Sequence, residues 1–308
     1  MAKETEWSKF KSLNRSVAAR EVLVQQGYPP TAMYILMDGV VDIFRNDKLI
    51  STIRNRGEYI GEISILLGSA YSATVIAAAP CTVIKIDAAD AGNFLRHSPE
   101  VAISIARKLA NRLVDLNKQI ANLANSPFTA SLTKLIEAER KKIENKEKVK
   151  EISFDTLSNL QVDFPPMYEI ITQNEMLFNL YILVKGEVEI IKNNKIIAIE
   201  SEPGYYMGDV SILRKALPNA TVRTRTECRM IQIPADRVDS FLSHSPEVAI
   251  SIARKIGERI LSINNVMEKL KDDGKDDKKK TKKEDEGFQI DEKTSAELED
   301  LMKRLGIL

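Results

Sequence analysis

The hydrophobic and polar positions of this chain follow one pattern twice, at a constant spacing of 147 residues. The segment His97–Lys108, HSPEVAISIARK, returns as His244–Lys255. The same offset relates apolar runs, glycines and Ala-Thr-Val triplets along most of each copy. A period this long does not fit a solenoid repeat, so the pattern predicts two tandem domains with the same fold.

Each copy reads as a series of short strands separated by turn residues. In the first copy, apolar runs at 33–37 and 40–44 flank Asp38-Gly39, which predicts a β-hairpin because glycine readily adopts positive φ. Asn46-Asp47 predicts a second turn before a strand at 49–53. Further strands are expected at 21–25, 73–78 and 81–87. Many short strands at close spacing favour an antiparallel barrel or sandwich.

Helical periodicity closes each copy. Ser98-Pro99-Glu100 predicts a helix start, because Ser caps, Pro fits the first turn and an acid suits the positive end of the dipole. Apolar residues then alternate at spacings of four and three, as in a coiled-coil seam. They are Leu109, Leu113, Leu116, Ile120 and Leu123 in the first copy, and Ile256, Ile260, Ile263, Met267 and Leu270 in the second. The seam either packs within its own chain or forms a homodimer, and both interpretations stay open.

The two copies set the expected domain boundaries. An N-terminal helical segment is expected at 1–19, the first domain at 20–124, a helical linker at 125–163 and the second domain at 164–270. Residues 271–286 carry seven acids and seven bases, so they cannot bury a core and are predicted to be a disordered tether. The tether completes a tail, 271–308, that ends in a short amphipathic helix with Leu298, Leu301, Met302 and Leu305 on one face.

Composition excludes several function classes. With 45 Lys+Arg against 44 Asp+Glu, there is no general electrostatic attraction to nucleic acid or to an anionic membrane. No apolar run is long enough for a membrane span and the polar start lacks a signal-peptide core, so we expect a cytoplasmic protein. Cys81 and Cys228 occupy equivalent positions in separate copies, as do the two histidines. We therefore expect no disulfide, no metal site and no catalytic dyad, and the chain does not read as an enzyme.

Candidate chemistry lies in a short helix between glycines. The run Gly57-x-x-x-Gly61-Glu62-Ile63-Ser64 is followed, after a loop, by Ala73-Thr74-Val75; the second copy has Gly204-x-x-x-Gly208-Asp209-Val210-Ser211 and then Ala220-Thr221-Val222. This arrangement resembles the phosphate-binding cassette of the cyclic nucleotide-binding domain family. The resemblance covers roughly residues 20–124 and 165–270. It implies a fold that is mainly β with α: two tandem antiparallel β-rolls (jelly rolls) with flanking helices, which bind cyclic AMP or cyclic GMP.

The resemblance also implies a ligand site in each copy. A glycine lets the backbone approach the ligand, the helix start directs free N–H groups at a cyclic phosphate, and the acid accepts hydrogen bonds from a ribose hydroxyl. The expected ligand-binding residues are Gly61, Glu62, Ile63, Ser64, Tyr71, Ser72 and Ala73 in the first copy, and Gly208, Asp209, Val210, Ser211, Pro218, Asn219 and Ala220 in the second.

The loop before Ala-Thr-Val departs from the family. Members usually pair an arginine there with the phosphate, whereas this chain has Tyr71 and Pro218. One lost charge-assisted hydrogen bond is worth roughly 1.5–3 kcal/mol, so cyclic AMP binding should be weak unless Arg214, Lys215 or Arg223 reaches the phosphate. Tyr71 could stack on a ligand or donate its hydroxyl, but it is expected to be mainly a surface aromatic. Arginine in its place should tighten binding roughly 10-fold or more.

Two functions of different class remain. The first is a non-enzymatic sensor of a cyclic nucleotide or related nucleotide, which signals to an unidentified protein partner by helix rearrangement. The alternative is a degenerate tandem that serves as a protein-interaction scaffold without nucleotide, with its charged tail and terminal helix as the docking element.

Overall fold

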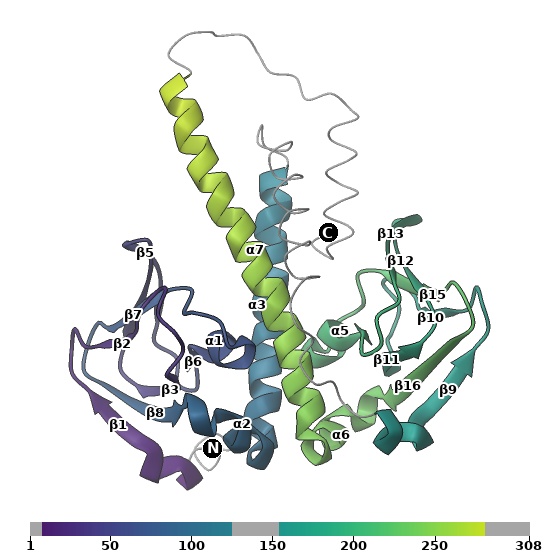
Figure 1. The fold of residues 1–308 in the computed structure, drawn as a ribbon, viewed down its shortest axis with the longest axis horizontal. Helices are drawn as coiled ribbons and strands as arrows, with labels where there is room; N and C mark the ends of the chain where they lie inside the picture. Colours follow the sequence, from purple (N-terminus) through teal and green to yellow (C-terminus); the bar gives the residue numbers. More distant parts are fainter. Residues whose placement is uncertain (1–7, 125–153, 281–308) are drawn as a thin grey trace. The chain divides into compact units, whose positions relative to one another are not determined.

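A computed structural model describes residues 8–124 and 154–280 of the chain (Figure 1). The chain forms two compact units, and the boundary between them falls inside one helix, between Ile105 and Ala106. None of the helices in these two described ranges is long and apolar enough to cross a membrane.

The first repeat consists of short strands followed by helices. It begins with a 3-10 helix, η1 (Ser8–Leu13). Its strands are β1 (Asn14–Val17), β2 (Val22–Val24), β3 (Ala32–Asp38), β4 (Val41–Arg45), β5 (Lys48–Ile53), β6 (Tyr59–Ile60), β7 (Thr74–Ala77) and β8 (Cys81–Asp87). Helix α1 (Glu62–Leu67) lies between β6 and β7, and α2 (Ala88–His97) and α3 (Pro99–Ala124) follow β8.

The strands form two four-stranded antiparallel sheets, in the orders β1-β8-β3-β6 and β2-β7-β4-β5. Side chains alternate along each strand, so one face of each sheet is apolar. These faces meet in a core that includes Val17, Leu36, Val41, Val75 and Val83. The expectation of an antiparallel β-roll with flanking helices is confirmed.

Asp38-Gly39 is not the tip of a hairpin, so that prediction is wrong. Strand β3 pairs with β6 and β8, whereas β4 pairs with β5 and β7. Gly39 is therefore a corner at which the chain crosses between sheets. Its φ is 99°, and a Cβ there would lie 2.5 Å from the Pro80 carbonyl oxygen. The Asn46-Asp47 turn does form a hairpin, between β4 and β5, with both residues at positive φ.

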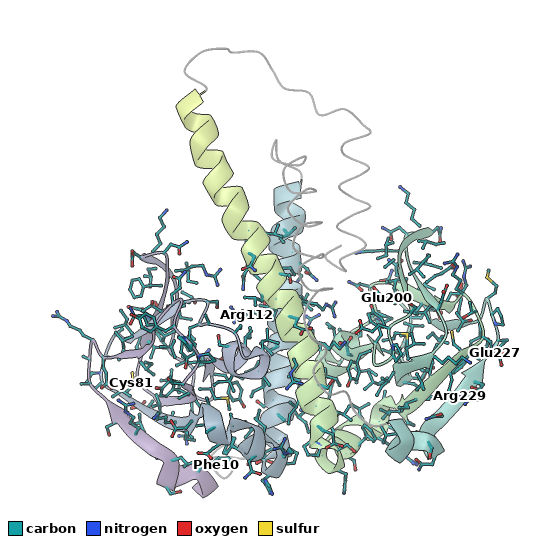
Figure 2. All side chains as sticks on the ribbon, viewed as in Figure 1. Phe10, Cys81, Arg112, Glu200, Glu227 and Arg229 are labelled. Carbon is teal, nitrogen blue, oxygen red and sulfur yellow. The ribbon has the colours of Figure 1, made fainter. Side chains whose placement is uncertain are left out.

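The first domain begins before the boundary expected at residue 20. Strand β1 pairs with β8 in register from Asn14 to Val17. Phe10, on η1 (labelled in Figure 2), is only 8% exposed. It packs on Phe94 of α2 with ring centroids 5.1 Å apart. This N-terminal segment is therefore part of the domain core.

The second repeat has the same plan. It begins with a 3-10 helix, η2 (Phe154–Leu160). Its strands are β9 (Gln161–Phe164), β10 (Glu169–Ile171), β11 (Asn179–Lys185), β12 (Val188–Lys192), β13 (Lys195–Glu200), β14 (Tyr206–Met207), β15 (Thr221–Thr224) and β16 (Cys228–Pro234). Helix α5 (Asp209–Arg214) lies between β14 and β15, and η3 (Ala235–Arg237), α6 (Val238–His244) and α7 (Pro246–Lys280) close the repeat. Its sheets are β9-β16-β11-β14 and β10-β15-β12-β13, so β9 places the domain start before the expected residue 164.

The seam residues are covered within one chain. Leu109, Leu113 and Ile120 on α3 and Ile256 and Ile260 on α7 are at most 2% exposed. Because packing within the chain already buries these residues, the structure favours intrachain packing of the seam over a homodimer. The expected connecting helix before residue 150 lies outside the described residues.

The charged run is partly helical, which corrects the expectation of disorder from residue 271. Helix α7 continues to Lys280. A helix that is already nucleated adds residues at little cost, and Asp276 stands four positions before Lys280, a spacing that favours helix. The remainder of the predicted tether and the expected terminal helix lie outside the described residues.

Candidate functional site

Each repeat contains the short helix expected between glycines. The helices α1 and α5 are preceded by Gly61 and Gly208, which adopt φ of 77° and 83°. These left-handed conformations explain why glycine is present at both positions. The acids that follow, Glu62 and Asp209, are each 7% exposed. The prediction of a short helix with an acid at its start is therefore confirmed in both repeats, and its role as a ligand site stays a prediction.

In the first repeat Tyr71 fills the space above Gly61. It is 5% exposed and belongs to the domain core. A Cβ on Gly61 would lie 2.9 Å from the Tyr71 ring. The expectation that Tyr71 is a surface aromatic is wrong, because its ring is buried against Gly61 in the domain core.

The Tyr71 hydroxyl is fully engaged by the backbone at the start of β3. It accepts the N–H groups of Thr31 and Ala32, both at 3.0 Å, and donates to the Ala32 carbonyl oxygen at 2.6 Å. Its own main chain is also held, because Tyr71 N–H donates to the Tyr28 carbonyl at 2.9 Å. These contacts fix the side chain in place.

The other predicted site residues of the first repeat lie around the Tyr71 side chain. Ser64 is 4% exposed, and its hydroxyl donates to the Ala70 carbonyl at 3.3 Å. The Ser72 carbonyl accepts Arg45 Nε at 3.1 Å. Ile63 is 8% exposed, and Ser72 and Ala73 are half-buried. The predicted residues thus meet in one place, but Tyr71 fills its centre.

The second repeat retains an open cavity beside its cassette. The cavity has a volume of about 200 Å³ and is lined by the predicted Gly208, Asp209, Val210, Ser211, Pro218, Asn219 and Ala220. Arg214 and Arg259 also line it. Lys192 lines it too, so the cavity combines a carboxylate, hydroxyl groups and three cations.

Asp209 is the buried charge of this cavity. Burial raises the pKa of its carboxyl, while the Arg259 guanidinium and the N–H groups of Asp209 and Val210 oppose that rise. Arg259 Nη1, on α7, lies 3.9 Å from Asp209 Oδ2. The Asp209 carboxylate therefore links the start of α5 to Arg259 of α7. It also accepts hydrogen bonds from N–H groups that an anionic ligand would otherwise bind.

The space above Gly208 is narrowed by an apolar side chain. A Cβ on Gly208 would lie 2.6 Å from Leu177 Cδ2. Pro218 is buried, and its carbonyl accepts the Asn174 N–H at 2.9 Å. The two repeats thus cover equivalent glycines with different residues, Tyr71 and Leu177, neither of which is the family's arginine.

Of the cations proposed to replace that arginine, only one lines the cavity. Arg214 does, whereas Lys215 is exposed and ends α5 in a left-handed conformation. Arg223 is bound to Glu189 of β12, with its Nη2 2.8 Å from Oε2. The sequence missed Arg259, which follows the cassette by some 50 positions. In the sequence, Arg259 is marked only by its position on the predicted helix, next to the seam residues Ile256 and Ile260.

Comparison with protein families assigns both repeats. The model described as the cyclic nucleotide-binding domain matches residues 14–98 and 161–245. These ranges cover more than half of the chain.

Curated relatives carry the same domains. The chain is 25% identical over 223 residues to a cAMP-dependent protein kinase regulatory subunit of Schizosaccharomyces pombe, an alignment that covers 68% of this chain and 47% of that protein. It is 27% identical over 220 residues to a cGMP-dependent protein kinase of Plasmodium berghei, covering 69% of this chain and 22% of that protein. The chain thus spans less than half of either relative.

Solved structures match this chain at lower identity. The regulatory subunit of a cAMP-independent protein kinase A from Trypanosoma brucei is 19% identical, with 76% of this chain and 75% of that chain covered and a TM-score of 0.30.

Proposed function

The chain belongs to the cyclic nucleotide-binding domain family, and from that premise we propose that it is a non-enzymatic sensor whose second domain binds a nucleotide. Ligand binding is relayed through helix α7 to a protein partner. The observation that carries the proposal is the cavity beside α5, where Asp209 faces Arg259 of α7 at 3.9 Å.

The two domains have unequal roles in this proposal. In the first, Tyr71 fills the place of the ligand and its hydroxyl has three backbone hydrogen bonds. Displacing the ring would break these bonds and open a buried core. The first domain therefore acts as a fixed module, and the second is the site that responds.

A nucleotide suits the groups that line the second cavity. Asp209 can accept hydrogen bonds from ribose hydroxyls, while Arg214 and Arg259 supply positive charge for a phosphate. Ser211 adds a neutral hydroxyl and Asn219 an amide. Cyclic AMP and cyclic GMP are the first candidates, and the missing arginine makes their binding weak.

The relay follows from competition for one carboxylate. In the free protein Asp209 faces Arg259. A ribose whose hydroxyls donate hydrogen bonds to Asp209 weakens the attraction of that carboxylate to the guanidinium, and a phosphate nearby offers Arg259 a new partner. Because Arg259 is part of α7, the exchange changes what holds the helix against the cassette.

The partner follows from the relatives. A fission-yeast relative is named as a regulatory subunit of a protein kinase. A kinase catalytic subunit is therefore the first partner to test.

Calorimetric titration of the full chain with cyclic AMP, cyclic GMP and cyclic dinucleotides tests the proposal. One ligand per chain is expected. Asp209→Ala should weaken binding roughly 10- to 150-fold, the value of a charge-assisted hydrogen bond, whereas the matched variant Glu62→Ala should leave it unchanged. Equal losses in both variants would contradict a single responsive domain.

The alternative, a scaffold without nucleotide, is favoured by the side chains over both glycines. Tyr71 and Leu177 each stand where a Cβ would collide. If none of the nucleotides binds the full chain, and Leu177→Ala does not create binding, the scaffold is the better conclusion.

A further inference from the structure

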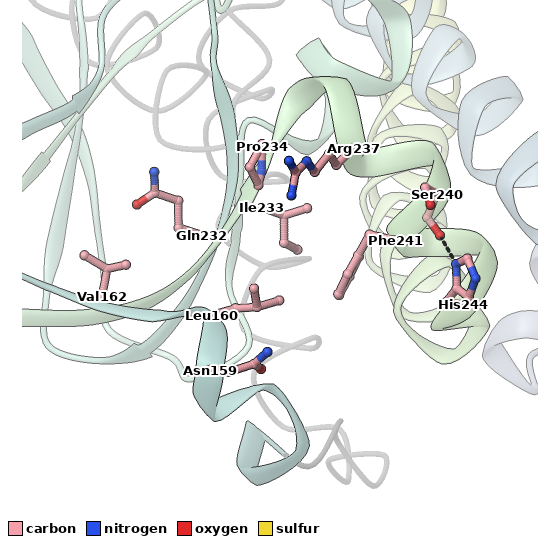
Figure 3. Close-up of a pocket in the computed structure, with 10 residues that line it drawn as sticks. All are labelled: Asn159, Leu160, Val162, Gln232, Ile233, Pro234, Arg237, Ser240, Phe241 and His244. Atoms are coloured by element: carbon pink, nitrogen blue, oxygen red, sulfur yellow. Dashed lines mark hydrogen bonds between the residues drawn. The ribbon is translucent and has the colours of Figure 1, made fainter.

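An open groove runs along one side of the second domain, away from the cassette (Figure 3). Strands β9 and β16, which pair side by side in one sheet, line it together with η2 and α6. Its volume is about 630 Å³, and Leu160, Val162, Ile233 and Phe241 line it with apolar side chains. None of the predicted ligand-binding residues of the second repeat lines this groove.

The first repeat fills the equivalent place with its own aromatic. There Phe10 packs on Phe94, the counterpart of Phe241, and is 8% exposed. The counterpart of Phe10 is Leu157, which is smaller and has non-helical φ and ψ that kink η2. Phe241 is left half-buried at the groove. The second repeat therefore has room for an apolar side chain that it does not supply from the same position.

The groove walls have also lost the charges that make this face a water-exposed surface in the first repeat. There Arg15 pairs with Glu21, and Lys85 lies 2.7 Å from Asp87. The second repeat replaces Arg15 by Val162, which is 40% exposed, Lys85 by Gln232 and Asp87 by Pro234. Because neighbouring charges became uncharged or apolar together, the change favours contact with another surface.

One positive charge remains at the groove. Arg237 is exposed, and within residues 8–124 and 154–280 it has no ion pair. Its counterpart in the first repeat is Asp90. A complementary occupant therefore presents an apolar face flanked by acidic residues.

The chain contains such a segment near its C-terminus. Residues 294–305 place Leu298, Leu301, Met302 and Leu305 at helical spacing, with Glu297, Glu299 and Asp300 among them. A helix of a dozen residues is marginal alone in water, so its leucine face requires a surface. Its apolar residues suit the groove and its three acids suit Arg237, while Lys303 and Arg304 stand near its end.

The distance that the chain has to cover between the end of α7 and the groove decides which copy supplies the segment. Helix α7 starts directly after α6 and carries the chain about 53 Å away, at 1.5 Å for each of its 35 residues. If the 13 residues between Lys280 and the segment formed a random coil, they would span about 20 Å on average, so docking on the same chain would need near-full extension. We propose that the groove binds the C-terminal segment 294–305 of a second copy of the chain.

Disulfide trapping between two full-length chains tests this. One chain carries Ser240→Cys, at the groove, and the other carries Leu305→Cys; the native Cys81 and Cys228 are buried. Under mild oxidation the mixture should give a disulfide-linked dimer. The matched control uses Asn93→Cys, the counterpart of Ser240 in the first repeat, and its yield should be at least 10-fold lower.

Substitutions that restore first-repeat residues complete the test. Val162→Arg with Arg237→Asp should reduce the yield at least 10-fold and lower the dimer fraction in sedimentation, whereas Arg15→Val should change neither. Equal yields at Ser240 and Asn93, or no product at all, would overturn the proposal and leave the groove to another protein. A doubly substituted chain that links only within itself would overturn the assignment to a second copy.

Discussion

Replacing Tyr71 by phenylalanine should destabilise the first domain by about 2–4 kcal/mol. The change keeps the ring over Gly61 and removes only the hydroxyl. The Ala32 N–H, in a residue that is fully buried, then loses its partner at 3.0 Å, which costs about 1–3 kcal/mol. The lost donation to the Ala32 carbonyl adds about 1 kcal/mol. Thr31 is exposed, so water can satisfy its N–H and it adds little.

Urea unfolding followed by hydrogen exchange in peptides of the first domain measures this free energy. The control is Tyr28→Phe, because Tyr28 is 58% exposed and should change stability by less than about 0.5 kcal/mol. A similarly small loss for Tyr71→Phe would refute the description of Tyr71 as a hydrogen-bonded plug. The same geometry revises the expectation for Tyr71→Arg: a guanidinium in this core should lower stability rather than restore a phosphate site.

Three further changes test other parts of the structure. Asp209→Asn should become more stable relative to the native chain as pH rises, because burial raises the folded pKa of Asp209 and disfavours its carboxylate. The gain should begin at about pH 4, where the unfolded carboxyl ionises, and continue through the raised folded pKa. A pH-independent difference in urea unfolding would contradict this. Gly39→Ala should cost about 2 kcal/mol or more in unfolding free energy, since φ is 99° and a Cβ meets a carbonyl oxygen at 2.5 Å, whereas Gly27→Ala, with positive φ but open space, should cost less. Thr224→Val should cost about 1–3 kcal/mol by thermal unfolding because the fully buried hydroxyl accepts the Tyr168 N–H at 2.9 Å; an unchanged melting temperature would show that water replaces this bond.

Turn chemistry shows how far local sequence reaches. Asn46-Asp47 predicted its hairpin correctly, because both residues tolerate positive φ and the adjacent strands pair directly. Asp38-Gly39 carries a similar signal but marks a crossing between sheets. A turn residue specifies the local backbone, whereas the choice of partner strand depends on residues far along the chain.

The candidate site likewise has features that local sequence specifies and features that depend on residues far along the chain. The sequence alone determined the repeat, both cassette helices, their glycines and the position of each acid, because these depend on backbone conformations within a few residues. Only the tertiary structure decided that Tyr71 fills the first site, since its hydroxyl partners Thr31 and Ala32 lie about 40 positions earlier. The same holds for Arg259, which reaches Asp209 from another helix. Long-range packing thus decides which side chains surround each of two similar helix starts.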